Sequence, residues 1–272
     1  MKLPQIILIL LAVAIAAILY FTPISPIAEK AEAQDLATEA AVSYVITDDV
    51  TEIKNELDSA ALAKVSRWET QQANDSLIVF YDMLRKPVGA AFHALKKAET
   101  LGTADSWTEA GERFLLNAKY LGDQPRKTRW YAQSREAFEK ALELAPEDLD
   151  LKVDLGVCMI EGASFLGTPP MEGIGILKSV EQQDPNNIKA LINLGYFAIR
   201  SGQFDKAEER FVKVLTIDDK FADAYLYLAD LHERQKLFAK AIEDLEKYKS
   251  LTEDPERIKE VDNYIQELNN NI

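Results

Sequence analysis

One pattern of residue types occurs twice between residues 184 and 251, at a fixed step of 34 residues. The matched positions hold, in order, a turn residue, a Leu, a small residue, an Ala and a bulky apolar residue. They are Pro185 and Asp219, Leu194 and Leu228, Gly195 and Ala229, Ala207 and Ala241, and Phe211 and Leu245. A step of this length indicates a stack of similar units, each of which buries its apolar face against its neighbours. The chain is therefore expected to form a linear array rather than one central core.

The pattern continues toward the N-terminus with an insertion. Gly156 lies 39 residues before Gly195, whereas Gly173 lies 34 residues before Ala207, so five extra residues lie between Gly156 and Gly173. The run from Gly167 to Pro170 contains two prolines and cannot continue a helix. It predicts that the extra residues form a lengthened loop between two helices.

One unit further back, Gly111 and Ser134 take the two small positions, with eleven residues more than the standard spacing between them. Ser106 and Glu109 form a capping-box sequence at the start of this unit, which predicts a helix N-terminus there. The extra residues are expected to lengthen the first helix and to form a basic loop from Gly122 to Arg129.

This pattern resembles the tetratricopeptide repeat (TPR), a helix–turn–helix unit with the signature W-x2-L-G-x2-Y…A-x3-F…P. Its opening is matched by Trp107-x2-Ala110-Gly111-x2-Phe114, while the three later units lack the Trp. The resemblance covers about two thirds of the chain, and is to bacterial proteins that carry such an array behind an N-terminal membrane anchor. It implies an all-α helix–turn–helix solenoid with a right-handed superhelical twist.

The array is expected to comprise about five helix pairs within residues 72–251. The first pair has the weakest pattern: its second helix keeps only Ala91, Leu95 and Ala98, behind a first helix over residues 75–85. After the array, Asp254 and Pro255 precede an amphipathic segment over residues 255–268. Such arrays need a terminal element that covers the last apolar face, so this segment is predicted to be a capping helix.

The N-terminal region is predicted to be a membrane anchor or signal sequence over residues 1–24, followed by a stalk and an amphipathic helix over residues 25–71. Residues 6–21 are uninterruptedly apolar and just long enough to span a bilayer as a helix. Lys2 is the only charged residue before Glu29, which places the N-terminus in the cytoplasm and the body on the extracytoplasmic side, periplasmic in bacteria. The alternative is a secreted protein whose signal is cleaved. The amphipathic helix is predicted over residues 51–68.

The charge and the scarce chemistry-bearing residues limit the function classes. The net charge of −14 would repel a phosphate backbone, so nucleic acid is not expected as a partner. Cys158 is the only cysteine, which rules out an intramolecular disulfide and a thiolate metal cage. His93 and His232 are the only histidines and are expected to be packed residues. No catalytic set, metal site or cofactor motif is selected by the sequence, and we expect no enzyme activity and no cofactor.

The resemblance implies where a partner would bind, because the first helices of TPR units line a concave groove. The matching positions are Val153, Val157 and Ile160 in the third unit, Lys189, Ile192, Tyr196 and Arg200 in the fourth, and Asp223, Leu226, Asp230 and Glu233 in the fifth. The carboxylate-clamp branch of the family needs Lys and Asn at several of these positions. Ile192, Tyr196, Leu226 and Asp230 stand there instead, so that activity is not expected. A mixed apolar and acidic groove suits an extended or helical segment that carries apolar and basic residues.

The leading hypothesis from sequence is a membrane-anchored scaffold or adaptor that binds a protein or peptide partner in the bacterial cell envelope. The competing hypothesis is an accessory subunit of an envelope enzyme or assembly machinery, or an enzyme that uses the two insertions as its site. Self-association through the ends of the array, giving a homo-oligomer, is the third.

Overall fold

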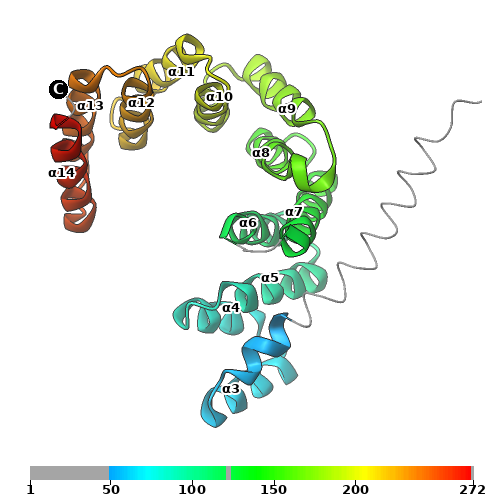
Figure 1. The fold of residues 1–272 in the computed structure, drawn as a ribbon. Coiled ribbons are helices and arrows are strands. Elements are labelled where there is room, and N and C mark those ends of the chain that lie inside the picture. The colour runs from blue at the N-terminus through cyan, green and yellow to red at the C-terminus, as the bar shows by residue number, and fades with distance from the viewer. Residues whose placement is uncertain (1–48, 121–123, 271–272) are drawn as a thin grey trace, which may run out of the picture. The chain divides into compact units, whose positions relative to one another are not determined.

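The computed structural model describes residues 49–120 and 124–270, and all regular structure in these ranges is helical (Figure 1). A short helical segment over residues 49–55 is followed by twelve helices. These are α3 (Ser59–Thr70), α4 (Asn74–Met83), α5 (Pro87–Leu101), α6 (Ala104–Tyr120), α7 (Gln124–Leu144), α8 (Leu149–Leu166), α9 (Pro170–Gln183), α10 (Ile188–Arg200), α11 (Phe204–Ile217), α12 (Ala222–Arg234), α13 (Phe238–Leu251) and α14 (Pro255–Asn269). The predicted all-helical solenoid is confirmed.

From α4 to α13 the helices form consecutive hairpins: α4/α5, α6/α7, α8/α9, α10/α11 and α12/α13. Three residues connect the two helices of every hairpin, and helices joined by so short a connection pack antiparallel. We call the even-numbered helices of these pairs the first helices and the odd-numbered ones the second helices. Each second helix also contacts the first helix of the next pair, so the apolar surface of one hairpin is buried by its neighbour.

Side-chain caps fix where several helices begin. The carboxylates of Asp148 and Asp254 and the amide oxygen of Asn187 accept hydrogen bonds from backbone N–H groups in the first turns of α8, α14 and α10. At α6 the cap lies one turn earlier than the sequence predicted. Thr103 and Ser106 exchange backbone-to-side-chain hydrogen bonds of 3.2 and 3.3 Å, so Thr103, not Ser106, is the capping residue.

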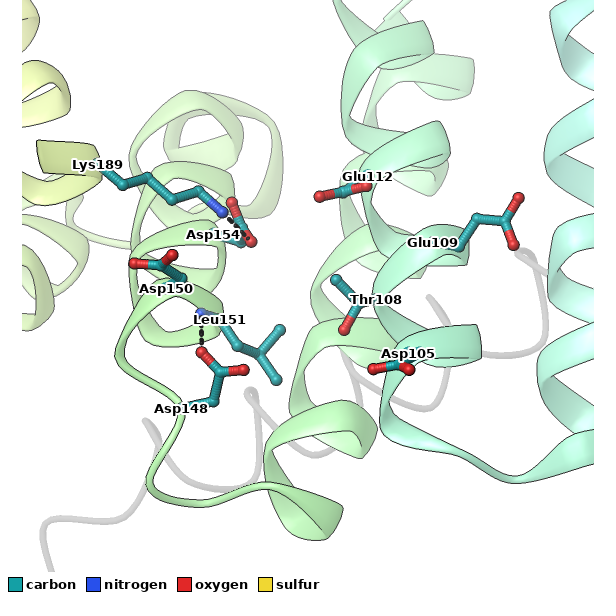
Figure 2. Close-up of a pocket in the computed structure, with 9 residues that line it drawn as sticks. All are labelled: Asp105, Thr108, Glu109, Glu112, Asp148, Asp150, Leu151, Asp154 and Lys189. Atoms are coloured by element: carbon teal, nitrogen blue, oxygen red, sulfur yellow. Dashed lines mark hydrogen bonds and ion pairs between the residues drawn. The ribbon is translucent and has the colours of Figure 1, made fainter.

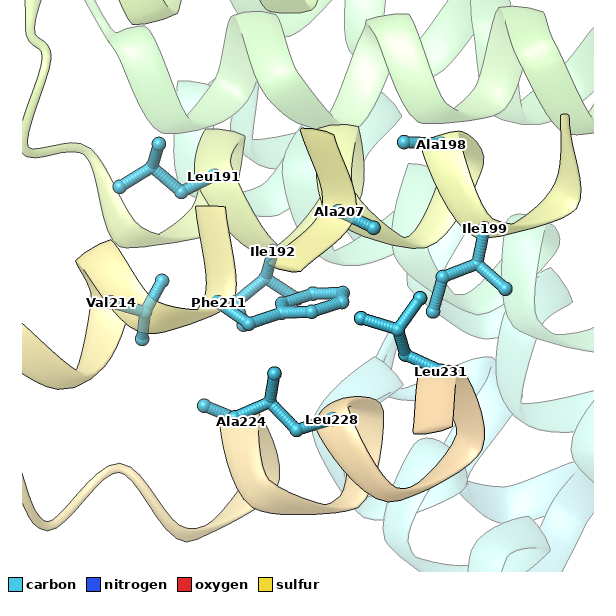
Figure 3. Packing of buried hydrophobic residues seen from close by; sticks show 10 residues of the cluster. All are labelled: Leu191, Ile192, Ala198, Ile199, Ala207, Phe211, Val214, Ala224, Leu228 and Leu231. Carbon is cyan, nitrogen blue, oxygen red and sulfur yellow. The ribbon is translucent and has the colours of Figure 1, made fainter. Parts of the chain in front are cut away.

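The small positions of the repeat bring the two helices of a hairpin into close contact. A Cβ atom built on Gly195 would lie 2.5 Å from the ring of Phe211, and one built on Gly111 would lie 2.7 Å from the ring of Phe138. Phe211 lies among side chains of α10, α11 and α12 (Figure 3). Its ring also stacks on that of Tyr227 at 5.3 Å. The bulky residue of one hairpin therefore also forms the contact with the next hairpin.

The second insertion lengthens the first helix α6, as predicted. The predicted loops do not form, because the remaining extra residues of both insertions are helical, which corrects that part of the prediction. α8 has 18 residues against 13 in α10, so it absorbs all five extra residues, and Gly167 ends it in the left-handed conformation at φ 67°. α6 is four residues longer than α10, and α7 is seven longer than α11, which accounts for the eleven residues of the second insertion. The predicted basic loop at 122–129 is instead the first turns of α7 from Gln124 onward, while residues 121–123 lie outside the described ranges.

The two lengthened regions pack against each other. The ring of Tyr131 in α7 stacks on that of Phe165 in α8 at 5.2 Å, and a Cβ atom on Gly162 would lie 3.0 Å from Tyr131. Cys158 is buried beneath them, with its sulfur 3.6 Å from the backbone oxygen of Tyr131. The extra turns of the second and third hairpins thus form one contact.

The chain ahead of the array differs from the single amphipathic helix predicted over residues 51–68. The helical segment over residues 49–55 ends before Asp58, whose carboxylate caps a separate helix, α3. Ile53 and Val65, one on each side of this break, are nevertheless both buried. Arg126, in the basic first turns of α7, pairs with Asp49 at 3.1 Å and so attaches the earlier segment to the array.

At the other end, α14 packs on α13 and buries Val261, Ile265 and Leu268 against Ala241, Leu245 and Tyr248. Within residues 49–120 and 124–270, no helix combines the length and the apolar character needed to cross a bilayer. The apolar run over residues 6–21 lies outside these ranges.

Candidate functional site

The first helices form one face along the array. α6 contacts α8, α8 contacts α10, and α10 contacts α12. Arg113 of α6 also reaches Asp82 of α4, with 3.1 Å between the guanidinium nitrogen and the carboxylate oxygen. We call the exposed and half-buried side chains on these five helices the first-helix face. A segment bound there would meet several repeats at once.

Polar contacts hold α8 and α10 together on this face. Lys189 Nζ lies 2.6 Å from Asp154 Oδ2, and the Asn187 side-chain amide donates to Asp150 Oδ1 at 2.7 Å. Two turns further along, Arg200 pairs with Glu161 at 3.2 Å. These contacts fix the relative position of the third and fourth first helices.

An acidic hollow of about 270 Å³ opens between α6 and α8 (Figure 2). Among the described residues, six carboxylates and a single ammonium group line it, together with Thr108 and Leu151. The charged residues are Asp105, Glu109, Glu112, Asp148, Asp150, Asp154 and Lys189. The carboxylate of Glu112 points from α6 across the hollow toward Asp154, and Lys189 approaches Asp154 from the other side. The hollow therefore carries an excess of negative charge.

Among the described residues, two carboxylates of the hollow, those of Asp154 and Glu109, form ion pairs. Asp154 is the less exposed of the two, with 14% of its side chain accessible to solvent. Burial raises its pKa to about 6, although the hydrogen bond from Lys189 opposes the shift, and the nearby Glu112 and Asp150 carboxylates raise it further. The Glu109 carboxylate is bound by Lys97 at 3.0 Å and by Arg113 at 3.2 Å. Added positive charge in the hollow would thus stabilise the ionised form of Asp154.

The predicted groove residues fall into two groups. Val153 and Ile192 are 0% and 9% exposed and belong to the core between hairpins, so a partner could not make substantial contact with them. Val157, Ile160 and Leu226 are half-buried. The first two pack on the core that contains Val153, and Leu226 packs on the core between α12, α13 and α14. Only part of each of these three side chains is therefore accessible on the first-helix face.

The polar predicted residues remain accessible but are mostly paired within the chain. Lys189 and Arg200 form the ion pairs described above, Asp230 pairs with Arg234 at 2.8 Å, and Asp223 is exposed. Glu233 accepts a hydrogen bond from the Tyr264 hydroxyl of α14. The fifth hairpin is therefore partly covered by the terminal helix.

Tyr196 lies between these groups, at the centre of an aromatic contact. Its half-buried ring meets Phe197 edge-on at 5.4 Å and Tyr227 at 6.3 Å, and the Arg200 guanidinium lies 5.7 Å from its centre. Its exposed part is available to a partner.

Sequence reasoning predicted the first two hairpins but assigned no groove positions to them. Leu116 follows Gly111 by five residues, as Arg200 follows Gly195, so α6 carries the same exposed positions as α10. On α6 these are Asp105, Thr108, Glu112 and Leu116, and α4 ends on Met83 as α10 ends on Arg200. The spacing that gave the later groove positions could have given these.

The buried histidines are structural members of the helix contacts. His232 Nδ1 lies 2.6 Å from Asp244 Oδ2, and burial raises the pKa of that carboxyl against the opposing His232. His93 stacks on Tyr81, and burial lowers its pKa to about 4. No cluster of three or more metal-ligating side chains occurs in the part of the chain that the structure describes.

Comparison with known proteins identifies the repeats. Family models of the tetratricopeptide repeat match residues 192–257 and residues 126–148. The longer match runs from α10 into the beginning of α14, and the shorter one lies on α7 and the turn after it. These two stretches are thus similar to tetratricopeptide repeats. No curated protein sequence matches it.

Solved structures share the fold. A thermophilic TPR protein of Thermus thermophilus is similar with a TM-score of 0.55 and 14% identity, over 72% of this chain and 97% of that one. PilW, described as a widely conserved type IV pilus biogenesis factor, is similar with a TM-score of 0.51 and 17% identity, over 72% of this chain and 91% of that one. At these identities the likeness concerns the fold.

Proposed function

We propose that this protein binds a segment of another protein along the first-helix face and so acts as a scaffold or adaptor. The observation that carries the proposal is the hollow between α6 and α8, which residues of three consecutive hairpins line. Contacts spread over several repeats are suited to an extended or helical segment rather than to a small molecule. The partly exposed ring of Tyr196 on the next first helix adds an aromatic contact of the kind enriched in binding hot spots.

The enzyme hypothesis has lost the observation that motivated it. It relied on long loops in the two insertions. The extra residues instead extend α6, α7 and α8, and only a three-residue connection remains at residues 167–169. We therefore favour the binding function.

We also propose that the array is held at the extracytoplasmic side of a membrane by residues 6–21. The support is the length and apolar character of that run and the position of Lys2. An enzyme reporter that folds only outside the cytoplasm, fused after residue 272, tests the placement. Activity of the reporter in the membrane fraction is expected, and activity only in the soluble fraction would indicate a cleaved signal instead.

In-cell crosslinking tests the binding function. A photo-reactive residue is placed at Tyr196 or at Glu112, and a control is placed at Val212, which is 50% exposed on the second helix α11. We expect one or two dominant crosslinked proteins from the two first-helix positions and none from Val212. Diffuse adducts from all three positions, or adducts only with the protein itself, would contradict a specific adaptor.

A further inference from the structure

We infer that the segment bound by this protein is amphipathic and basic, with its apolar side chains seated on the first two hairpins and its basic side chains in the acidic hollow. The inference rests on the proposed function and adds the chemistry of the partner and its direction on the face.

The apolar part is formed by α4 and α6. Val79 and Met83 lie one turn apart on α4 and are 58% and 77% exposed, and Leu116 and Tyr120 lie one turn apart on α6 and are 57% and 81% exposed. The Arg113–Asp82 ion pair joins the two helices. Asp82 directly precedes Met83, and Arg113 lies three residues before Leu116. Large apolar side chains exposed in this way on two helices that share an ion pair are typical of an interaction site.

The acidic part continues directly from the apolar part along α6. Glu112 lies one turn before Leu116, Thr108 one turn before Glu112, and Asp105 three residues before Thr108, so these side chains form one stripe with Leu116 and Tyr120. Across the hollow, α8 adds Asp150 and Asp154, and Lys189 is the only cation among the described residues that line it. A bound segment that followed α6 would pass from an apolar to a strongly negative surface.

The charge of the hollow and the apolar surface beside it together indicate the chemistry of the bound segment. Lys and Arg side chains would neutralise the excess of carboxylates, whereas an anionic lipid surface would be repelled by them. Large apolar side chains would bury the surface of Met83 and Tyr120, which otherwise stays in water. A single peptide segment with both features satisfies both parts of the surface.

The test is a selection of random 16-residue peptides, displayed on phage, against the immobilised full chain. The selected peptides are then measured against three double variants. M83S with Y120S removes the apolar contacts, E112Q with D150N removes charge from the hollow, and E143Q with E147Q is the control that removes two exposed carboxylates elsewhere.

We expect selected peptides that join an apolar cluster to Lys or Arg residues. Binding should weaken at least about tenfold in M83S with Y120S, since two large apolar contacts are lost. In E112Q with D150N it should weaken severalfold and depend less on salt, and in the control it should not change. Circular dichroism confirms that each variant is folded.

Other outcomes distinguish failure of this inference from failure of the proposed function. Peptides that are acidic, or whose binding is lost on substitution of Tyr196 and Leu226 but not in these variants, would overturn this inference and leave the proposed function standing. Absence of any selected peptide, with binding of the chain to anionic lipid vesicles that M83S and Y120S abolish, would overturn both.

Discussion

At the residue scale, a few glycines set how closely the helices of a hairpin approach. Gly195 faces the ring of Phe211, whereas at Gly175 in α9 no described atom of a neighbouring helix lies within 4 Å of the position that a Cβ would take. The same substitution should therefore have opposite effects at these two sites, because only one of them is in contact with a neighbouring helix.

We expect Gly195→Ala to destabilise the folded chain by about 1 to 3 kcal/mol, since its methyl group would overpack against Phe211. Gly175→Ala is the matched control and should stabilise by up to about 1 kcal/mol, because Ala favours a helix interior over Gly. Urea unfolding followed by circular dichroism measures both. Equal effects of the two substitutions would show that Gly195 is not a contact position.

The pKa of Asp154 gives a second prediction at this scale. This pKa is about 6 in the folded chain, against an ordinary value of 3.8. Between about pH 4 and pH 6, Asp154 therefore carries a proton in the folded chain that it has lost in the unfolded chain. The stability that this group contributes is therefore fully present below about pH 4 and is lost as the pH rises through about 6. The unfolding free energy of the wild type relative to Asp154→Asn should fall by on the order of 2 kcal/mol between pH 4 and pH 7. A difference that rises with pH would contradict this account of the hollow.

At the element scale, the lengthened helices α7 and α8 stabilise each other through Tyr131 and Phe165. Tyr131 is 3% exposed, so Tyr131→Ala should destabilise by about 3 kcal/mol. Because the two rings stack, the double variant with Phe165→Ala should be less destabilised than the two single variants together, with a coupling of about 0.5 to 1.5 kcal/mol. Phe138→Ala combined with Phe165→Ala is the control pair, and strict additivity in the Tyr131 pair would refute the contact.

The terminal helix gives another prediction at this scale. A chain that ends at Thr252 would expose Ala241, Leu245 and Tyr248, which α14 now covers. We expect a loss of at least about 4 kcal/mol from the three lost apolar contacts of α14 and self-association through the uncovered end. Sedimentation velocity and urea unfolding measure the two effects. Removal of residues 270–272 alone serves as the control, and a monomeric, equally stable truncated chain would show that α14 is not needed as a cap.

The hairpins themselves were predictable from the sequence, but the conformation of all the inserted residues was not. The 34-residue step and the small positions at Gly195 and Ala207 identified the hairpins because close helix packing tolerates few other residues there. Gly167 marks where α8 ends. The local sequence does not determine how many helical turns precede it, because residues 161–166 are compatible with either helix or loop. That choice depends on the contact with Tyr131, which comes from another hairpin.

The candidate site was predictable only in part, for a related reason. Repeat spacing places Val153 on the same side of the first helix as Val157, but its complete burial depends on how closely α10 approaches α8. The hollow likewise arises from the distance between α6 and α8, which no pattern within one repeat records. Its acidity could have been noticed, since Asp105, Glu112 and Asp150 occupy positions that the pattern already defined.

At the scale of the whole molecule, we propose that the first helices, and not the second helices, receive the partner. Methyl NMR spectra tell these faces apart because exposed methyl groups occur on both. Met83 and Leu116 lie on the first helices α4 and α6 and are 77% and 57% exposed, while Met171 and Val212 lie on the second helices α9 and α11 and are 64% and 50% exposed.

The decisive measurement is therefore a titration of the methyl-labelled chain with the segment identified by crosslinking or peptide selection. The account predicts that the methyl resonances of Met83 and Leu116 shift and saturate with the segment while those of Met171 and Val212 do not move. Shifts confined to Met171 and Val212 would place the partner on the second helices and would contradict the proposed binding face.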